Sequence, residues 1–333
     1  MHDNRKPMMG YPLTPGACSP VTSSRLQVFA SLSAAGALRG CAVAIGNFDG
    51  VHLGHQRLFQ LARQLAAARG GKAVALTFDP HPVRVLKPQL APPLITPLSR
   101  KLELFSSCEL DAAVVQPFDV EYSRSEALTF VERDLAGYLG AAEVVVGHDF
   151  TAGRGRTRVE GLRRLLSTCG IGLTVVEPVV SDGIVVSSTK IREFLLEGNM
   201  DGASQLLGRP HDVDGIAVRG AGRGRGFGFP TANVQTEAML PAHGVYAVRC
   251  RVGSNARYDG VCNVGTKPTV QQDGQVVVEA HLFDFEDREL YGETIRIAFV
   301  ERLREEHRFA SVDALRAQIA DDAARARALL RSM

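Results

Sequence analysis

The 333-residue sequence has no uninterrupted run of about 18 apolar residues, which excludes a transmembrane helix. Its six cysteines show no Cys-x-x-Cys spacing, so neither a zinc site nor a disulfide framework is predicted. Charge of either sign is not in excess, because 38 Lys and Arg residues face 36 Asp and Glu residues. A dominant attraction to nucleic acid or to a membrane surface is therefore not expected. These absences favour an ordinary globular protein of the cytoplasm.

Composition and hydrophobic patterning divide the chain into three parts. The length suits about two domains, each with its own core. Residues 1–25 are rich in Met, Pro, Gly and Ser and lack the apolar core of a signal peptide, so we expect a flexible extension there. Helical patterning ends near residue 207, where short alternating segments begin. We therefore expect a first domain over 26–206 and a second over 207–333.

Residues 46–55 form a glycine-rich turn between two segments with clear periodicity. The apolar run 41–45 predicts a buried parallel strand, and the spacing over 58–65 predicts a helix. Strand, turn and helix together gather backbone N–H groups and the positive end of a helix dipole, which suits phosphate. His52 and His55 share one face of that helix start. A metalloprotease motif spaces its histidines differently and adds a Glu, so phosphate is favoured over metal, with a plain turn as the alternative.

The rest of the first domain alternates strands and helices. A strand over 72–78 is followed by the double-proline loop 79–82, and a strand over 143–147 is followed by Asp149. Ser125 is expected to cap a helix that runs to residue 139. The alternation predicts a doubly wound parallel sheet, with both loops at the edge where such sheets bind ligands. A stiff connection and a simple turn residue are the alternatives for the two loops.

Two later segments of this domain carry phosphate-like chemistry. Ser188, Thr189 and Arg192 lie at the predicted start of a helix, where hydroxyls act as caps or, with exposed N–H groups and a guanidinium, hold a triphosphate. Residues 153–158 read Gly-Arg-Gly-Arg-Thr-Arg, which fits a basic phosphate or RNA patch. We prefer a solvated loop for this second segment.

The second domain has short alternating segments with glycine-rich turns, which predict an antiparallel barrel. Candidate strands are 216–219, 245–252, 258–264, 276–285 and 294–303. Ser311 is expected to start a final amphipathic helix that packs on the barrel. Its apolar stripe comprises Val312, Leu315, Ile319, Ala323, Ala326 and Leu330.

Three features of the second domain suggest a nucleotide site. Residues 220–229 carry a glycine at every second position, so backbone N–H groups could line a nest, although a flexible basic loop is the alternative. The segment does not match Walker A. Thr231 and Asn233 then offer oxygen ligands of the kind that Mg²⁺ uses. Glu279 lies in an otherwise apolar strand, where an acid requires a reason and a core salt bridge is one explanation.

These motifs resemble one known family. Gly-Asn-Phe-Asp-Gly-Val-His-Leu-Gly-His (46–55) resembles the H-x-G-H signature of nucleotidylyltransferases, in the form found in prokaryotic bifunctional riboflavin kinase/FAD synthetases. Residues 77–82 and 187–192 are similar to the flavin-side loop and the Ser-Ser-Thr-x-x-Arg element of that family. Gly-Phe-Gly-Phe-Pro-Thr-Ala-Asn (226–233) resembles the riboflavin kinase signature. The resemblance covers residues 26–330, with Ala152 standing where the family usually has an aromatic residue.

The resemblance implies a Rossmann-like nucleotidylyltransferase domain followed by a riboflavin kinase barrel, both using ATP and Mg²⁺. It implies catalytic roles for His52, His55 and Glu279, the histidines stabilising phosphate charge and the glutamate acting as general base. It implies nucleotide contacts for Gly46, Phe48, Asp49, Ser188, Thr189, Arg192, Gly222, Gly224, Gly228, Thr231 and Asn233. Thr231 and Asn233 would also hold Mg²⁺. Flavin contacts are implied for Phe78, His81, Asp149, Arg304 and Phe309.

The implied function is phosphorylation of riboflavin to FMN and then adenylylation of FMN to FAD. Riboflavin, FMN and ATP are the expected partners, with no nucleic acid or membrane, and the chain is expected to be a monomer or a weak homo-oligomer. One alternative retains a single activity, with the other domain only binding flavin or nucleotide. Others are an adenylyl or cytidylyl transfer to a different acceptor, and a non-enzymatic flavin- or RNA-binding protein suggested by the Arg-Gly stretches.

Overall fold

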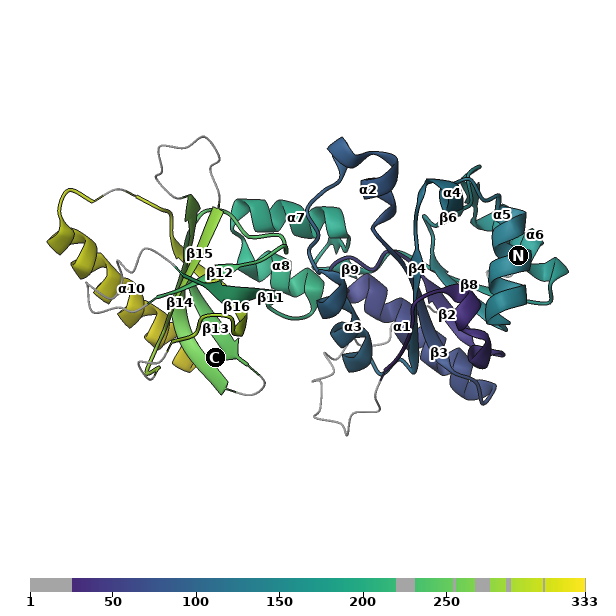
Figure 1. The fold of residues 1–333 in the computed structure, drawn as a ribbon, viewed down its shortest axis with the longest axis horizontal. Coiled ribbons are helices and arrows are strands. Elements are labelled where there is room, and N and C mark those ends of the chain that lie inside the picture. Colours follow the sequence, from purple (N-terminus) through teal and green to yellow (C-terminus); the bar gives the residue numbers. More distant parts are fainter. Residues whose placement is uncertain are drawn as a thin grey trace, which may run out of the picture.

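A computed structural model describes residues 26–219, 231–253, 256–266, 276–285, 289–307 and 309–332. The predictions for residues 1–25 and for Gly222, Gly224 and Gly228 lie outside these ranges. Figure 1 shows an α/β domain beside a barrel that carries a long C-terminal helix. Within the described residues, no helix is long and apolar enough to cross a membrane.

The first domain is built on a six-stranded parallel sheet of order β1-β4-β3-β2-β5-β8. These strands are Gln27–Phe29 (β1), Ala112–Pro117 (β4), Ala73–Asp79 (β3), Ala42–Ile45 (β2), Glu143–Gly147 (β5) and Gly172–Val176 (β8). Its central strands are buried on both faces, because helices cover each side. The predicted doubly wound parallel sheet is confirmed.

The two faces of the sheet are packed differently. One face, rich in alanine, lies against α1 (Leu53–Ala68) and α3 (Leu98–Ser107), whose Phe59 and Phe105 fill the space that small residues leave. The other face presents valine, leucine and isoleucine to η4 (Phe130–Leu139) and α6 (Val159–Thr168). Each strand thus alternates its side chains between two separate cores.

Strand order reverses next to β2. The chain runs from β2 through β3 to β4 on one side, and later places β5 and β8 on the other. In open α/β sheets ligands bind outside the carboxyl ends of the strands at such a reversal. The turn after β2 and the loop after β5 therefore face the same crevice.

One helix start differs from its prediction. The helix begins at Ala127 with α5 (Ala127–Thr129) and continues directly into the π-helical η4. Its N-cap is Glu126, which makes no side-chain cap hydrogen bond. Ser125 instead accepts a hydrogen bond at its carbonyl oxygen from the Arg154 N–H. The cap prediction was wrong because this tertiary contact, 29 residues along the chain, fixes the backbone before the helix.

Short elements complete the first domain. They are η1 (Leu32–Ala34), η2 (Gly36–Leu38), α2 (Pro82–Leu86), η3 (Pro88–Leu90), α4 (Val120–Ser123), β6 (Thr151–Ala152), β7 (Thr157–Arg158), β9 (Val180–Ser181) and β10 (Ile184–Val185). The basic segment 153–158 lies at the β6–β7 hairpin, where Arg154 pairs with the exposed Glu126.

The second domain is a closed barrel of order β11-β12-β15-β14-β13-β16, which confirms the antiparallel prediction. Its strands are His211–Val218 (β11), Ala232–Gln235 (β12), Val276–Leu282 (β15), Ala256–Thr266 (β14), Gly244–Val252 (β13) and Thr294–Arg304 (β16). Tyr246, Cys262, Val278 and Phe299 are among the side chains that fill its interior. Strand β12 was not among the predicted strands.

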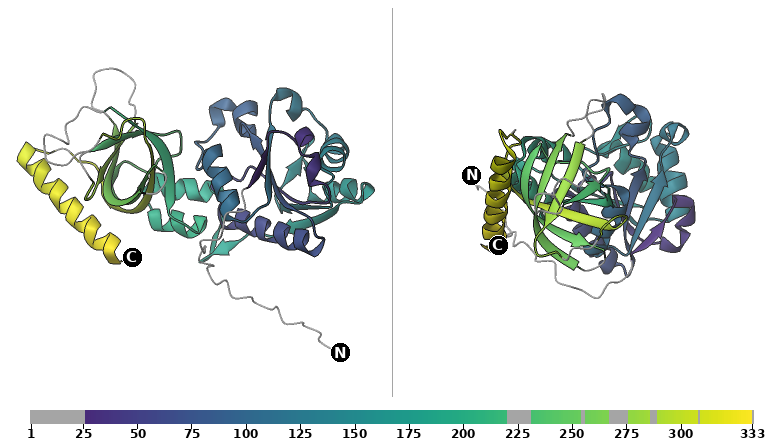
Figure 2. Two further views of the ribbon diagram at one scale, coloured as in Figure 1. Left: turned by 60° about the horizontal axis from the view of Figure 1, so that its bottom comes forward. Right: turned by 60° about the vertical axis from the view of Figure 1, so that its left-hand side comes forward.

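The terminal helix α10 (Val312–Ser332) lies along the outside of the barrel (Figure 2). Ser311 caps it by accepting a hydrogen bond from the Ala314 N–H at 3.1 Å, as predicted. Ala326 and Leu330 are buried against the outer barrel surface, whereas Val312 is 52% exposed. The predicted stripe is therefore buried only in the C-terminal half of the helix.

An ion pair fastens this helix to β16. Arg304 Nε donates to both carboxylate oxygens of Asp322 at 3.0 and 2.9 Å, and Asp322 is only 2% exposed. Asp322→Ala should lower the free energy of unfolding by about 3 kcal/mol, because it leaves a largely buried guanidinium unpaired. Denaturant titration checks this. The exposed neighbour Asp321 gives the control, and equal stability of the two alanine variants would contradict the prediction.

Helices α7 (Ser188–Glu197) and α8 (Met200–Leu207) connect the two domains. Their buried side chains, including Leu195 and Leu207, share one apolar cluster with the barrel interior. Backbone hydrogen bonds also cross the junction, from Met239 N–H to Leu94 O and from Ala242 N–H to Leu195 O, both at 2.8 Å. The boundary at residue 206 stays a prediction, since these helices pack on both bodies.

Candidate active sites

The turn after β2 brings the two predicted histidines together. His52 is the N-cap of α1, and its Nδ1 accepts a hydrogen bond from the His55 N–H at 3.4 Å. The two imidazole rings stack with their centroids 3.6 Å apart. Gly54 leaves space for this arrangement, since a Cβ there would lie only 3.1 Å from the His52 ring. The spacing His-x-Gly-His thus produces a paired imidazole surface at the start of a helix.

Both histidines are neutral at neutral pH. Burial lowers the pKa of His52 to about 4, although the nearby Asp49 opposes this. Burial also lowers the pKa of His55 well below its ordinary value, with the electrostatic interaction between the two histidines and the charge of Lys101 as further causes. Among the described residues, no hydrogen-bond partner reaches the buried His55 Nδ1. The His55 Nδ1 is therefore a buried polar atom that a bound ligand could satisfy.

Protonation of His52 should destabilise the fold as pH falls. The pKa of His52 in the folded chain is about 4, below the ordinary 6.5. Between these two values the unfolded chain binds more protons than the folded chain, so stability is lost as the pH falls through this range. Going from pH 7.5 to pH 4.5 should remove about 2 to 3 kcal/mol through His52 alone. Denaturant titration at both pH values should show a smaller loss for His52→Asn than for the exposed control His243→Asn. Equal losses would contradict the assignment.

Asp49 connects three segments around this turn. Its carboxylate accepts hydrogen bonds from the N–H groups of Ile95 and Thr96 at 3.2 and 3.0 Å, and it pairs with Arg192. Its carbonyl oxygen accepts from Ser188 Oγ at 2.8 Å. The side chain is 3% exposed. The Asp49 carboxylate thus holds the walls of the site together, and its predicted nucleotide contact stays a prediction.

The element at the start of α7 faces the histidine turn. Ser187 is the N-cap, accepting from the Lys190 N–H at 3.2 Å, while Ser188 binds the turn and Thr189 is exposed. Arg192 donates from Nε to Pro93 O at 3.1 Å and from Nη2 to Asp49. Within the described part of the chain, its Nη1 makes no hydrogen bond or ion pair. The structure therefore brings Ser188 and Arg192 into contact with Asp49 of the histidine turn, with Thr189 exposed beside them.

Phe48 and Gly46 pack against each other on the buried side of the turn. The Phe48 ring is 1% exposed and packs edge-on against His55, Phe59 and Phe105. Its side chain is therefore buried, and any nucleotide contact is left to its backbone. The Gly46 backbone lies close to this ring, and a Cβ at Gly46 would lie only 2.9 Å from it. Glycine avoids this contact.

Sequence reasoning missed two residues that support the turn. Lys101 on α3 is 4% exposed and donates from Nζ to Asn47 O at 2.8 Å. Burial lowers its pKa, while Asp49 and Asp79 oppose the shift. Thr96 Oγ1 accepts a hydrogen bond from the Gly50 N–H at 2.9 Å. Neither residue lies in a recognisable motif, and each contacts the turn from about 50 positions away.

The predicted flavin residues lie at the ends of the strands beside β2. The Phe78 ring, at the carboxyl end of β3, packs against the rings of Phe118 and Tyr122. His81 is the N-cap of α2, and its Nδ1 accepts from the Val83 N–H at 3.2 Å. Asp149 is exposed after β5. The order β3-β2-β5 therefore sets these three residues on either side of the histidines.

A separate hollow of about 500 Å³ lies at the opposite edge of the sheet. It is lined by Gln60, Arg63, Gln64, Ala66, Ala67, Gly71, Ala73, Glu109 and Asp111. These residues surround the amino ends of β3 and β4, whereas ligands bind such sheets at the carboxyl ends. The hollow is therefore not part of the site.

The barrel forms a second site on its outer surface. Glu279 on β15 pairs in register with Asn233 on β12 and with Asn263 on β14. Residues that pair across antiparallel strands point to the same side, and their neighbours Val278 and Ala280 fill the interior. The three polar side chains therefore form one row on the outside of the barrel. This row sets an acid between two carboxamides.

Asn233 and Thr231 fit a cation beside that row. Asn233 is 7% exposed, and its buried Oδ1 has no hydrogen-bond partner among the described residues. An orphaned amide oxygen is costly unless a ligand satisfies it, and oxygen is the donor that Mg²⁺ prefers. Thr231, exposed two residues earlier, offers a second oxygen. The donor set is thus compatible with Mg²⁺ and a nucleotide.

Arg304 and Phe309, predicted as flavin contacts, lie together at the end of β16. The Arg304 guanidinium stands 5.6 Å from the centroid of the Phe309 ring. Most of its donors are already used, since it binds Asp322, Glu305 O and His307. A flavin contact through Arg304 stays a prediction, with its apolar stem and the Phe309 ring as the available surfaces.

Comparison with known proteins matches both regions. Residues 35–190 match the family model described as FAD synthetase, and residues 207–330 match the one described as riboflavin kinase. A bifunctional riboflavin kinase/FMN adenylyltransferase of Bacillus subtilis (strain 168) is 37% identical over 84% of this chain and 89% of its own length. The chain belongs to the bifunctional riboflavin kinase/FMN adenylyltransferase family. This membership bears out the resemblance seen in the sequence and favours two activities over one.

Further relatives agree with this family. The bifunctional riboflavin kinase/FMN adenylyltransferase of Escherichia coli (strain K12) is 36% identical over 86% of this chain and 92% of its own. A solved structure of a Streptococcus pneumoniae protein, described as a macrolide-efflux protein, has a TM-score of 0.80 at 29% identity. It covers 89% of this chain and 96% of its own. The arrangement of both domains is therefore shared with a solved protein.

Proposed function

We propose that this chain phosphorylates riboflavin to FMN with ATP and then adenylylates FMN to FAD. The observation that carries the proposal is the presence of two separate constellations, one in each family-matched region. His52 and His55 stack at the switch point of the parallel sheet. Glu279 lies in register with Asn233 on the barrel. Each constellation suits one of the two reactions.

The adenylyl transfer needs no protein nucleophile. A phosphate oxygen of FMN attacks the α-phosphorus of ATP, the new P–O bond forms, and the bond to pyrophosphate breaks. Catalysis then depends on in-line positioning and on donors aimed at the developing charge. His52, His55 and Arg192 supply these donors, while Asp49 holds Arg192 and the 95–96 segment in place. We propose that Phe78, His81 and Asp149, which lie at the ends of the strands beside β2, contact the flavin.

The kinase reaction needs a base. Glu279 accepts the proton of the riboflavin 5′-hydroxyl as that oxygen attacks the γ-phosphorus of ATP and ADP leaves. Thr231 and the orphaned Oδ1 of Asn233 would hold Mg²⁺, which neutralises phosphate charge when bound. Arg304 and Phe309 would contact the flavin from the end of β16. Gly222, Gly224 and Gly228 are proposed to line the nucleotide, although they lie outside the described residues.

Product analysis tests the proposal. The full chain is incubated with riboflavin, or with FMN, in the presence of ATP and Mg²⁺, and flavins are separated by liquid chromatography. Riboflavin should give FMN and FAD, FMN should give FAD and pyrophosphate, and a chelator should stop both. Absence of both products with Mg·ATP would overturn the function.

We further propose that the enzyme works in the cytoplasm as a monomer or weak homo-oligomer, without nucleic acid or membrane. Burial raises the pKa of the Cys41 and Cys250 thiols to about 12, which suits cysteines that stay reduced. Light scattering on the purified chain measures the oligomeric state, and a large stable assembly would contradict this part.

A further inference from the structure

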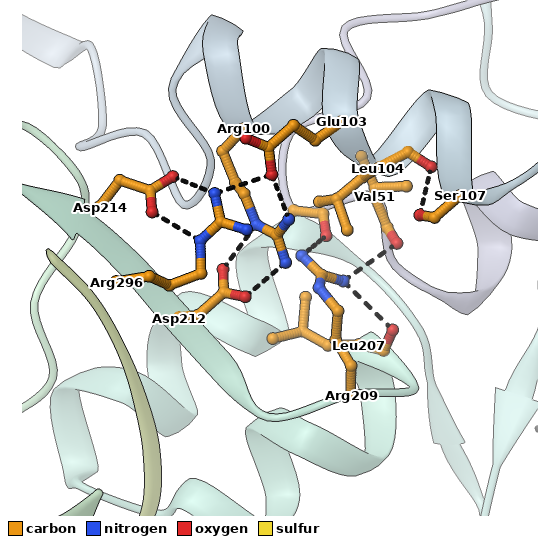
Figure 3. Close-up of polar contacts among 11 residues, drawn as sticks. Val51, Arg100, Glu103, Leu104, Ser107, Leu207, Arg209, Asp212, Asp214 and Arg296 are labelled. Atoms are coloured by element: carbon orange, nitrogen blue, oxygen red, sulfur yellow. Dashed lines mark hydrogen bonds and ion pairs between the residues drawn. The ribbon is translucent and has the colours of Figure 1, made fainter. Parts of the chain in front are cut away.

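Arg209 reaches from the domain junction into the histidine turn. It lies between α8 and β11, and its Nη2 donates to Gly50 O at 2.9 Å. Its Nη1 lies 3.4 Å from both Val51 O and Leu207 O. Figure 3 shows the guanidinium directed at the carbonyl oxygens of Val51 and Leu207. A residue some 160 positions away in the chain thus holds the two residues that directly precede His52.

The turn that Arg209 contacts is conformationally unfavourable. Phe48, Gly50 and Val51 have φ angles of 50°, 88° and 43°. The left-handed region is poorly tolerated by side chains other than glycine, and least by β-branched ones such as Val51. Backbone of this kind persists only where its surroundings fix it. Since His52 follows Val51 directly, the orientation of its ring depends on this strained segment.

Other arginines at the junction are used differently. Arg100 pairs with Asp212 at 2.5 Å and with Glu103 at 2.8 Å, and Arg296 pairs with Asp214 and Glu103 at 2.5 and 2.7 Å. Among the ion pairs of the described residues, none involves Arg209. Its Nε is buried without a hydrogen-bond partner in the described part of the chain. A cation that served only to join the domains would be expected to pair with a carboxylate, as its two neighbours do.

A second side chain acts beside Arg209. Gln56 Nε2 on α1 donates to both Val51 O and Leu207 O at 2.9 Å. The end of α8 and the histidine turn are therefore bridged twice through the same two carbonyl oxygens. Burial lowers the pKa of Arg209 to about 10, so the guanidinium is still charged at neutral pH. Its charge is also among the causes that lower the pKa of His52 and His55.

We propose that Arg209 is a positioning residue for FMN adenylylation, which holds the Gly50 and Val51 carbonyl groups so that His52 and His55 face the ATP phosphates. This inference rests on the proposed function. Arg209 lies in the region matched by the riboflavin kinase model, and so the kinase side of the chain completes the adenylyltransferase site. The adenylyltransferase reaction then depends on the contacts of this one junction residue with the turn, and not on the other junction ion pairs.

Steady-state kinetics on the full-length chain tests this. Arg209→Met should lower kcat for FAD formation about 10- to 100-fold, as expected for misplaced catalytic groups, with a smaller change in KM for ATP. Arg209→Lys, which keeps the charge, should recover part of the loss. Riboflavin phosphorylation in the same preparation is the internal reference and should be unchanged.

The pH profile separates positioning from a general loss of structure. Without the Arg209 charge the pKa of both histidines rises, so the histidine-dependent limb of the kcat/KM profile should move to higher pH in Arg209→Met and not in Arg209→Lys. Arg100→Met removes the Arg100–Asp212 ion pair at the junction without touching the turn and should leave kcat for FAD formation close to wild type.

Three outcomes would overturn the inference. They are unchanged kcat in Arg209→Met, equal loss in Arg100→Met, and parallel loss of both activities in every Arg209 variant. A wild-type chain that formed no FAD would instead overturn the proposed function, so the two failures are distinguishable.

Discussion

Replacement of both His52 and His55 by asparagine is expected to lower kcat for FAD formation by roughly 10³-fold, because each imidazole is a preorganised donor to developing phosphate charge. Asparagine is a good N-cap residue, so the helix start that His52 now caps should persist. Riboflavin phosphorylation should continue at the wild-type rate, since Glu279 and Asn233 lie in the other domain. Separate assays with riboflavin and with FMN measure both activities.

The exposed His243 supplies the control for that experiment. His243→Asn should keep both activities at wild-type level. The assignment of the two histidines fails if the double variant makes FAD normally, or if it loses FMN formation to the same extent as FAD formation.

Glu279→Gln is expected to have the opposite effect. It should lower riboflavin phosphorylation by about 10²- to 10⁴-fold, the contribution of a well-placed general base. The amide keeps the size of the side chain and so preserves the row with Asn233 and Asn263. Adenylylation of added FMN should proceed normally, because His52, His55 and Arg192 are untouched.

A matched control uses an exposed glutamate elsewhere on the barrel, directly after β16. Glu305 has a side chain that is 83% exposed, and Glu305→Gln should leave both reactions unchanged. If Glu279→Gln phosphorylated riboflavin at the wild-type rate, another group would have to accept the hydroxyl proton.

Local patterns were sufficient to predict most of the fold. The strand, turn and helix around residues 46–55 follow from apolar runs and glycines that are adjacent in sequence, and the structure confirms them as β2 and α1. Alternation of such units was enough to predict the parallel sheet. Strand β12 was missed because its four residues carry little pattern, and its pairing with β11 and β15 is what makes it a strand.

The candidate site was predictable only in part. His52 and His55 belong to one short motif, so their proximity followed from helix geometry. The nucleotide contact of Asp49 stays a prediction, whereas the partners of its carboxylate, Ile95, Thr96 and Arg192, were not foreseen and lie 46, 47 and 143 positions away. Such long-range partners leave no local trace in a single sequence.

The same limit explains the residues that sequence reasoning did not find. Lys101 lies within an amphipathic helix, where lysine is common on the solvent side, and only the folded structure turns it toward Asn47 O. Arg209 lies in a connecting segment before β11, where no motif marks it. In both cases the signal is a buried cation directed at a backbone carbonyl oxygen, which requires coordinates to see.

The most direct test of two consecutive reactions follows labelled phosphorus from ATP. The full chain is incubated with riboflavin, Mg²⁺ and ATP labelled at either the α- or the γ-phosphorus, and FMN and FAD are separated. Two reactions in series predict γ-label in FMN and both labels in FAD, the α-label entering with the AMP moiety. FMN without γ-label, or FAD without α-label, would contradict the account.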